Sequence, residues 1–198
     1  MAYMTTQKTK LKVMKLTFKP LKWIVAASLF IAAANANAQG TVMVGGAAMY
    51  PTKDIIENAV NSKDHTTLVA AVKAAGLVET LKSEGPFTVF APTNAAFNKL
   101  PNGTVDGLLK PEAKGKLTDV LTYHVVAGRI DLKSLLKMIK DNGGSYTAKT
   151  VQGGQLTFMK RGKKIMIKDS SGRVATVTIA NVFQKNGVIH VINTVLLP

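Results

Sequence analysis

The sequence of 198 residues contains no cysteine. A chain without cysteine forms no disulfide, and it has no thiolate to act as a nucleophile or as a metal ligand. It also offers no N-terminal cysteine for lipid attachment. The fold must therefore be held by the packing of its core.

Short enzyme motifs are absent as well. The three histidines, His65, His124 and His190, are scattered along the chain, and none stands in an H-E-x-x-H arrangement. Residues 143–147, GGSYT, lack the last glycine of a G-x-S-x-G nucleophile elbow. No glycine-rich phosphate-binding motif occurs. We therefore predict no catalytic residues, no metal site and no cofactor.

Acidic residues are scarce: 11 Asp and Glu stand against 26 Lys and Arg. Six of the lysines precede an apolar run at residues 23–34, which is followed by the A-x-A sequence Ala36-Asn37-Ala38. The run is shorter than the ~20 residues of a membrane-spanning helix. We predict that residues 1–38 are a secretory signal peptide, with Met14 as an alternative start, and that the protein is periplasmic or extracellular without a membrane span.

Removal of this segment leaves 20 basic and 11 acidic residues, a net charge of +9. Residues 39–49 are small and have no period, so we predict a flexible leader followed by one domain at 50–198. Apolar residues at helical spacing predict helices over 55–60, 68–75, 78–82, 111–121 and 132–139. Thr52 is the expected cap of the first helix, and Asp64 or Thr66 that of the second.

After residue 144 the apolar period changes from helical to two. This pattern predicts five strands, separated by glycine-containing turns, over 146–151, 156–160, 163–168, 174–183 and 188–197. Residues 87–90, FTVF, are apolar on both faces and predict an earlier buried strand. The expected class is α+β, with most helices first and a meander of hairpins after them.

Three segments carry a family resemblance: FTVFAPTNAAF at 87–97, YHVV at 123–126 and GVIHVINTVLLP at 187–198. In this order they resemble the signature segments of the fasciclin family, and the start of the domain resembles that of small bacterial single-domain members. Asn193 stands where many relatives have Asp, and Ala127 where many have Pro.

The resemblance implies a FAS1-type fold, a wedge-shaped β-sandwich with N-terminal and packed helices. It also implies a non-enzymatic adhesion or interaction module that contacts a cell-surface or matrix protein or glycan. In animal members the Tyr-His segment is a proposed integrin contact, which maps onto Tyr123 and His124. Other members bind carotenoids, so a carrier of an apolar, carotenoid-like ligand is an alternative.

The residues themselves favour structural roles in these segments. Pro92 fixes the exit from the strand, while Thr93 and Asn94 are suited to bond their own backbone and start a helix. His190 shares a strand face with apolar neighbours and is expected to be buried and hydrogen-bonded. Tyr123 and His124 have a structural interpretation beside the binding one. The remaining residues that we assign to structural motifs are Phe90, Phe97 and Asn193.

Positive charge is concentrated in the sequence Lys160-Arg161-Gly162-Lys163-Lys164, at the tip of a predicted hairpin. Such a tip is suited to an anionic polymer such as a polysaccharide or lipopolysaccharide, an anionic lipid or extracellular DNA. The other interpretation is a solvated tip whose lysines prevent strand association. No aromatic residues alternate with the charges, so we predict no sequence-specific nucleic-acid recognition.

Overall fold

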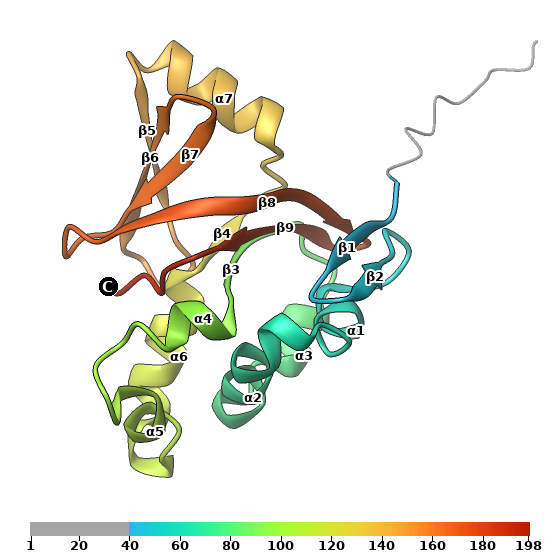
Figure 1. Ribbon diagram of the computed structural model, residues 1–198, viewed down its shortest axis with the longest axis vertical. Helices are drawn as coiled ribbons and strands as arrows, with labels where there is room; N and C mark the ends of the chain where they lie inside the picture. Colours follow the sequence, from blue (N-terminus) through green and yellow to red (C-terminus); the bar gives the residue numbers. More distant parts are fainter. Residues whose placement is uncertain (1–39) are drawn as a thin grey trace, which may run out of the picture. The chain divides into compact units, whose positions relative to one another are not determined.

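The computed structural model describes residues 40–198, so the predicted signal peptide lies outside the described part. Its main element is a seven-stranded sheet in the order β4-β3-β9-β8-β7-β6-β5 (Figure 1). Only β3 and β9 pair in parallel; the other neighbours are antiparallel. The strands are β3 Phe87–Pro92, β4 Val125–Ala127, β5 Ser145–Lys149, β6 Gln155–Arg161, β7 Lys164–Lys168, β8 Val174–Gln184 and β9 Gly187–Ile192.

The long strand β8 joins the two halves of this sheet. Its first residues pair with β7 and its later residues with β9, and its register shifts twice between Val177 and Val182. Asn181, within this irregular stretch, has φ 59°. Bulges of this kind bend a strand. The bend allows the two halves to face each other, and Phe90 of β3 packs against Phe158 of β6 with ring centroids 5.2 Å apart.

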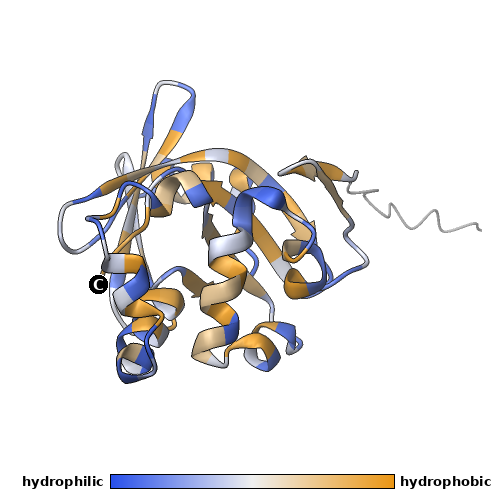
Figure 2. Cartoon of the chain, turned by 60° about the horizontal axis from the view of Figure 1, so that its bottom comes forward, coloured by the Kyte–Doolittle hydropathy of each residue, from blue (hydrophilic) through white to orange (hydrophobic). Residues whose placement is uncertain are grey.

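Helices cover both halves of the sheet. In Figure 1, α2 and α3 lie beside β3 and β9, and α7 lies along β5, β6 and β7 at the other end. Figure 2 shows hydrophobic stretches along the central strands and hydrophilic residues gathered in turns and loops. The helices are α1 Ile55–Ala59, α2 Thr66–Ala75, α3 Val78–Lys82, α4 Asn94–Phe97, α5 Thr104–Leu108, α6 Lys114–Tyr123 and α7 Leu132–Asp141, with short 3-10 helices at Lys63–His65 and Pro111–Ala113.

The α+β wedge predicted from the sequence is confirmed, and so are most of its elements. Within residues 40–198, no helix has the length and apolar character needed to cross a bilayer. The predicted strand at 188–197 is too long, because β9 ends at Ile192. The predicted cap of α1 is also wrong. Asp54, not Thr52, accepts a hydrogen bond from the Glu57 backbone N–H (2.8 Å), and the Glu57 carboxylate accepts one from the Asp54 N–H (2.9 Å), which forms a capping box.

The prediction of a flexible leader at residues 39–49 is also wrong. Strands β1 Val42–Val44 and β2 Ala47–Met49 form a hairpin around Gly45 and Gly46, whose φ values of 58° and 76° suit a tight two-residue turn. A Cβ on Gly45 would lie 2.3 Å from Ser62 Oγ, so the turn sits closely against the segment after α1. Val44 and Met49 are buried in the core.

This hairpin is predicted to contribute to stability through one face only. Met49 is 3% exposed and Met43 is 60% exposed. We expect Met49→Ala to lower the free energy of unfolding by about 2–4 kcal/mol, because it removes buried apolar contacts and leaves a cavity. Met43→Ala is the matched control and should change stability by less than ~0.5 kcal/mol. Urea unfolding of both variants measures this, and equal effects would contradict a docked hairpin.

Candidate functional site

The fold brings the three signature segments together on neighbouring strands. β3 lies between β4 and β9, with Phe87 opposite Gly187 and Pro92 opposite Ile192 in the parallel pair. Residues almost 100 positions apart in the chain thus become direct neighbours. The histidines and hydroxyls of these segments are the first candidates for a functional site.

His124 is used internally at both ring nitrogens. It follows the last residue of α6 and is 3% exposed. Its Nδ1–H donates to the Val120 carbonyl (2.8 Å), and its Nε2 accepts from the Leu196 backbone N–H (3.0 Å). Burial lowers the pKa of His124 to about 4, against the weaker opposing effects of the Val120 carbonyl and of Asp169. The ring is therefore neutral and ties α6 to the C-terminal segment.

Tyr123 is fully buried, and its hydroxyl has two partners. The hydroxyl donates to the Gln155 carbonyl (2.7 Å) and accepts from the Ser170 N–H (3.0 Å). Neither Tyr123 nor His124 presents a side chain to a partner in this structure. The contact role that the resemblance implied for them does not agree with their burial, and the structural interpretation does.

His190 is also buried and hydrogen-bonded, as expected from its strand pattern. Its Nε2–H donates to the Ile130 carbonyl (2.9 Å), and its Nδ1 accepts from the Asn181 N–H (3.4 Å). The ring stacks on Phe90 with centroids 5.7 Å apart. Burial lowers the pKa of His190. Asn181 also accepts from the Leu132 N–H (2.7 Å), so the pair fixes the start of α7 against the sheet.

The sequence predicts no catalytic residue and no metal ligand among these histidines. Across residues 40–198, no three His, Asp or Glu side chains are placed to hold a metal ion. The acid that acts on His124, Asp169, has its oxygens engaged by the backbone N–H groups of Arg173 (2.8 Å) and Leu197 (3.0 Å). The polar groups of the signature strands therefore close the interior.

Asn94 has a role that the sequence did not indicate. Its Oδ1 accepts from the Thr67 N–H (3.0 Å), and its Nδ2 donates to the Lys63 carbonyl (2.9 Å). It thus caps α2 from another helix, which corrects the predicted local caps Asp64 and Thr66. Thr93 behaves as predicted: its Oγ1 accepts from the Ala96 N–H (3.3 Å) at the start of α4.

Asn193 and Phe97 complete the sequence-predicted motif residues. Asn193 Oδ1 accepts from the Thr176 N–H (2.8 Å), and the Asn193 N–H donates to the Thr176 carbonyl (3.2 Å), so this residue holds the segment after β9 to β8. The bond needs only an acceptor oxygen, which Asn supplies as well as Asp. Phe97 is buried in a small cluster with Leu100 and Val195.

The sequence did not indicate the roles of three buried amides, Asn58, Gln184 and Asn186. Asn186 Oδ1 accepts from the Ile55 N–H (3.1 Å), and its Nδ2 donates to the Leu81 carbonyl (2.7 Å). Asn58 bonds both the Tyr50 backbone and the Gln184 side chain. These three side chains link α1, α3 and the residue after β2 to the end of β8 and to the β8–β9 turn. The Asn-Gly sequence predicted a turn, but no local pattern indicated these distant partners.

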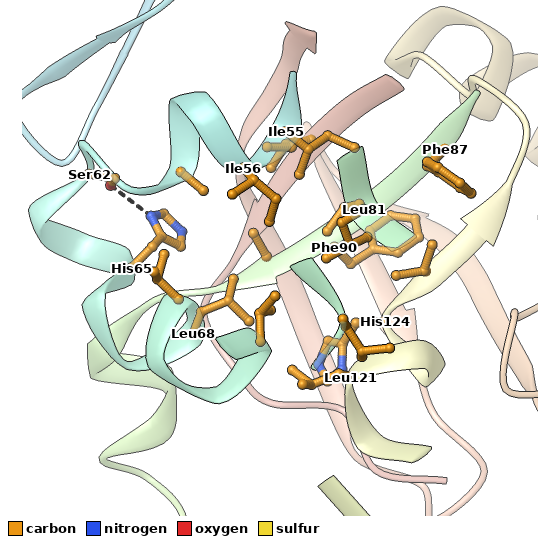
Figure 3. A pocket seen from close by; sticks show the side chains of 18 of the residues that line it. Ile55, Ile56, Ser62, His65, Leu68, Leu81, Phe87, Phe90, Leu121 and His124 are labelled. Carbon is orange, nitrogen blue, oxygen red and sulfur yellow. Dashed lines mark hydrogen bonds between the residues drawn. The ribbon is translucent and has the colours of Figure 1, made fainter. Parts of the chain in front are cut away.

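An apolar cavity of about 110 Å³ lies where α1, α2 and α3 cover β3 and β9 (Figure 3). Its walls include Ile55, Leu68, Val72, Phe90 and Ile189. Two further lining residues, Lys73 and Thr80, are solvent-exposed, so the cavity reaches the surface between α2 and α3. His65 and Ser62 add polar atoms to the lining.

The basic hairpin predicted from the sequence is the turn from β6 to β7. Lys160, Arg161, Lys163 and Lys164 are all exposed, and none of them forms an ion pair with an acid among the described residues. The surrounding sequence is just as one-sided. Residues 142–198 hold eight Lys and Arg and a single acid, Asp169, which is buried. This stretch of the chain therefore contributes almost no negative charge to the surface.

The pKa of His124 generates a prediction about stability. The unfolded chain binds a proton near pH 6.5, but the native ring binds one only near pH 4. The contribution of this group is complete above pH 6.5 and is lost as the pH falls toward 4, by about 1.4 kcal/mol per pH unit. NMR titration of the folded protein should place the His124 midpoint near 4. A midpoint near 6.5 would contradict the buried, neutral ring.

Comparison with known proteins agrees with this geometry. The family model described as "Fasciclin domain" matches residues 63–198. Protein sll1483 of Synechocystis is 47% identical over 80% of this chain and 81% of its own, and cell surface glycolipoprotein MPB83 of Mycobacterium bovis is 35% identical over 82% and 67%. The FAS1 domain pair of the insect cell adhesion molecule Fasciclin I matches with a TM-score of 0.66 at 18% identity, over 74% of this chain and 51% of that one. The chain belongs to the fasciclin domain family.

Proposed function

We propose that the protein is an exported, non-enzymatic interaction module that attaches to an anionic component of a cell surface or matrix. The observation that carries this proposal is the exposed positive charge of the β6–β7 turn, which forms no ion pair among the described residues. The anionic component fits the partner class expected from the sequence, a surface or matrix protein or glycan.

The polar groups of the signature segments form hydrogen bonds inside the fold, which supports binding through other surface residues. His124, His190 and Tyr123 direct their polar atoms to backbone partners inside the fold. Binding energy must therefore come from surface groups or from the cavity. Among the described residues, positions 160–164 hold the densest run of one charge in the sequence, and their exposed lysine and arginine side chains are accessible to a long polymer.

The relatives support a location outside the cytoplasm. MPB83 is named a cell surface glycolipoprotein, and Fasciclin I is a cell adhesion molecule. Fasciclin family members are adhesion or surface proteins and are generally without catalysis. The N-terminal segment of this chain has the sequence pattern of a signal peptide. Attachment outside the cell fits all three.

Binding to alginate, an anionic polysaccharide, tests the proposal, with neutral dextran as the reference polymer. We expect alginate binding at low salt that weakens steeply as NaCl is raised, because released counterions and screening oppose it. Arg161→Glu/Lys163→Glu should weaken binding by about tenfold or more at 50 mM NaCl. Biolayer interferometry with immobilised polymer measures both effects.

The control is Lys110→Glu/Lys116→Glu, which changes the net charge equally. These two exposed lysines lie by α5 and at the start of α6, at the opposite end of the molecule in Figure 1. The control should bind nearly as well as the unchanged protein. Equal loss in both variants would mean a response to net charge alone, and salt-independent binding would refute an electrostatic contact.

A further inference from the structure

The cavity under α1, α2 and α3 contains an unusual polar atom. His65 is 4% exposed, and its Nε2 is the one buried side-chain nitrogen or oxygen within residues 40–198 that has no hydrogen-bond partner. Leaving such an atom unsatisfied destabilises the folded protein, because the atom has lost its hydration without gaining a hydrogen bond. Buried polar atoms without a partner are rare in native proteins, and they often mark a functional site or a bound molecule.

The other ring nitrogen determines what Nε2 offers. Nδ1 of His65 lies 2.8 Å from Ser62 Oγ (Figure 3). The Ser62 hydroxyl is able to donate to Nδ1 or accept from it, so Nε2 can serve as a donor or as an acceptor. Burial lowers the pKa of His65, which keeps the ring neutral. The Ala91 carbonyl partly counteracts this shift but does not form a hydrogen bond with Nε2.

Water is a poor match for this position. A buried water needs two to four polar partners. The other polar groups of the lining are already engaged or exposed: both nitrogens of His124 are bonded, and the Thr122 hydroxyl donates to the Thr118 carbonyl (2.7 Å). The remaining walls are apolar. A matching occupant has an apolar body and a single polar group.

The volume of the cavity limits the size of the occupant's apolar part. An engineered apolar cavity of about 150 Å³ binds benzene, and this cavity is about 110 Å³. It has room for a short alkyl chain or for the end of a longer one. A carotenoid-like ligand would place only an end group inside. The exposed rim at Lys73 and Thr80 leaves a path by which the rest of a longer chain reaches solvent.

We propose that this cavity binds an alkyl chain ending in a hydroxyl group, with the hydroxyl on His65 Nε2 and the chain against the apolar walls. A hydroxyl both donates and accepts, which suits either state of the Ser62–His65 pair. A carboxylate would lose its hydration opposite a neutral ring, which is costly. The site is independent of the basic β6–β7 turn.

The test uses 1-hexanol, hexanoate and xenon as probes, followed by amide NMR shifts of the protein. We expect 1-hexanol to shift the signals of Leu68, Val72 and Ile189, and hexanoate to need at least about tenfold higher concentration. Xenon, which occupies dry apolar cavities, should shift the same signals. Absence of shifts with both hexanol and xenon overturns the proposal. Tighter binding of hexanoate overturns the hydroxyl assignment, and so does a long-lived water at the His65 ring.

Variants separate the polar contact from the cavity. His65→Leu should weaken hexanol binding by roughly three- to tenfold, the worth of one net hydrogen bond, while xenon binding stays the same. Ala59→Phe fills the cavity from α1 and should abolish binding of both probes. Val60→Phe is its matched control, because Val60, the C-cap residue of α1, is 47% exposed and does not line the cavity. Unchanged hexanol affinity in His65→Leu removes His65 from the site.

The Arg161→Glu/Lys163→Glu variant keeps this test apart from the proposed surface function. It should bind hexanol as the unchanged protein does, whatever its affinity for alginate. Loss of hexanol binding in this charge variant would contradict two independent sites.

Discussion

The parallel pairing of β3 with β9 is the constraint on which the rest of the structure depends. It joins the first and last signature segments over six consecutive residue pairs, although about 100 residues separate them in the chain. The contacts of such a pairing stabilise the fold only after the entropy of the intervening chain has been lost. The elements between the two strands must therefore be ordered on the sheet that contains this pair. The signature residues determine which contacts they make there.

Buried hydrogen bonds supply that specificity. His124 ties α6 to the segment after β9, His190 ties the start of α7 to the sheet, and Asn186 ties α1 and α3 to the β8–β9 turn. Each is a side chain bonded to backbone groups of a distant segment. Since a buried polar group without its partner is costly, these bonds penalise any other register of the strands. The histidine and hydroxyl groups of the signature segments are thus engaged in hydrogen bonds within the fold.

The sequence predicted what local pattern determines. Leucine spacing predicted α7, the change to period two predicted the meander from β5 to β8, and the apolar setting of His190 predicted its burial. What it missed depends on distant contacts or on very short elements. Strands β1 and β2 have three residues each, too few to show a period, and Asn94 caps α2 from 27 positions away. The cavity was not predicted either, because its walls come from many separate elements between residues 44 and 191.

The two proposed binding features follow from one asymmetry in how this chain treats polar groups. Among the described residues, every buried side-chain nitrogen and oxygen is paired except Nε2 of His65, a residue that lines the cavity. Ten of the eleven acids lie before residue 142, and the exposed cations of the basic turn form no ion pair among the described residues. We therefore propose that other molecules bind at these two places, the unpaired nitrogen in the cavity and the dense group of exposed cations at the turn.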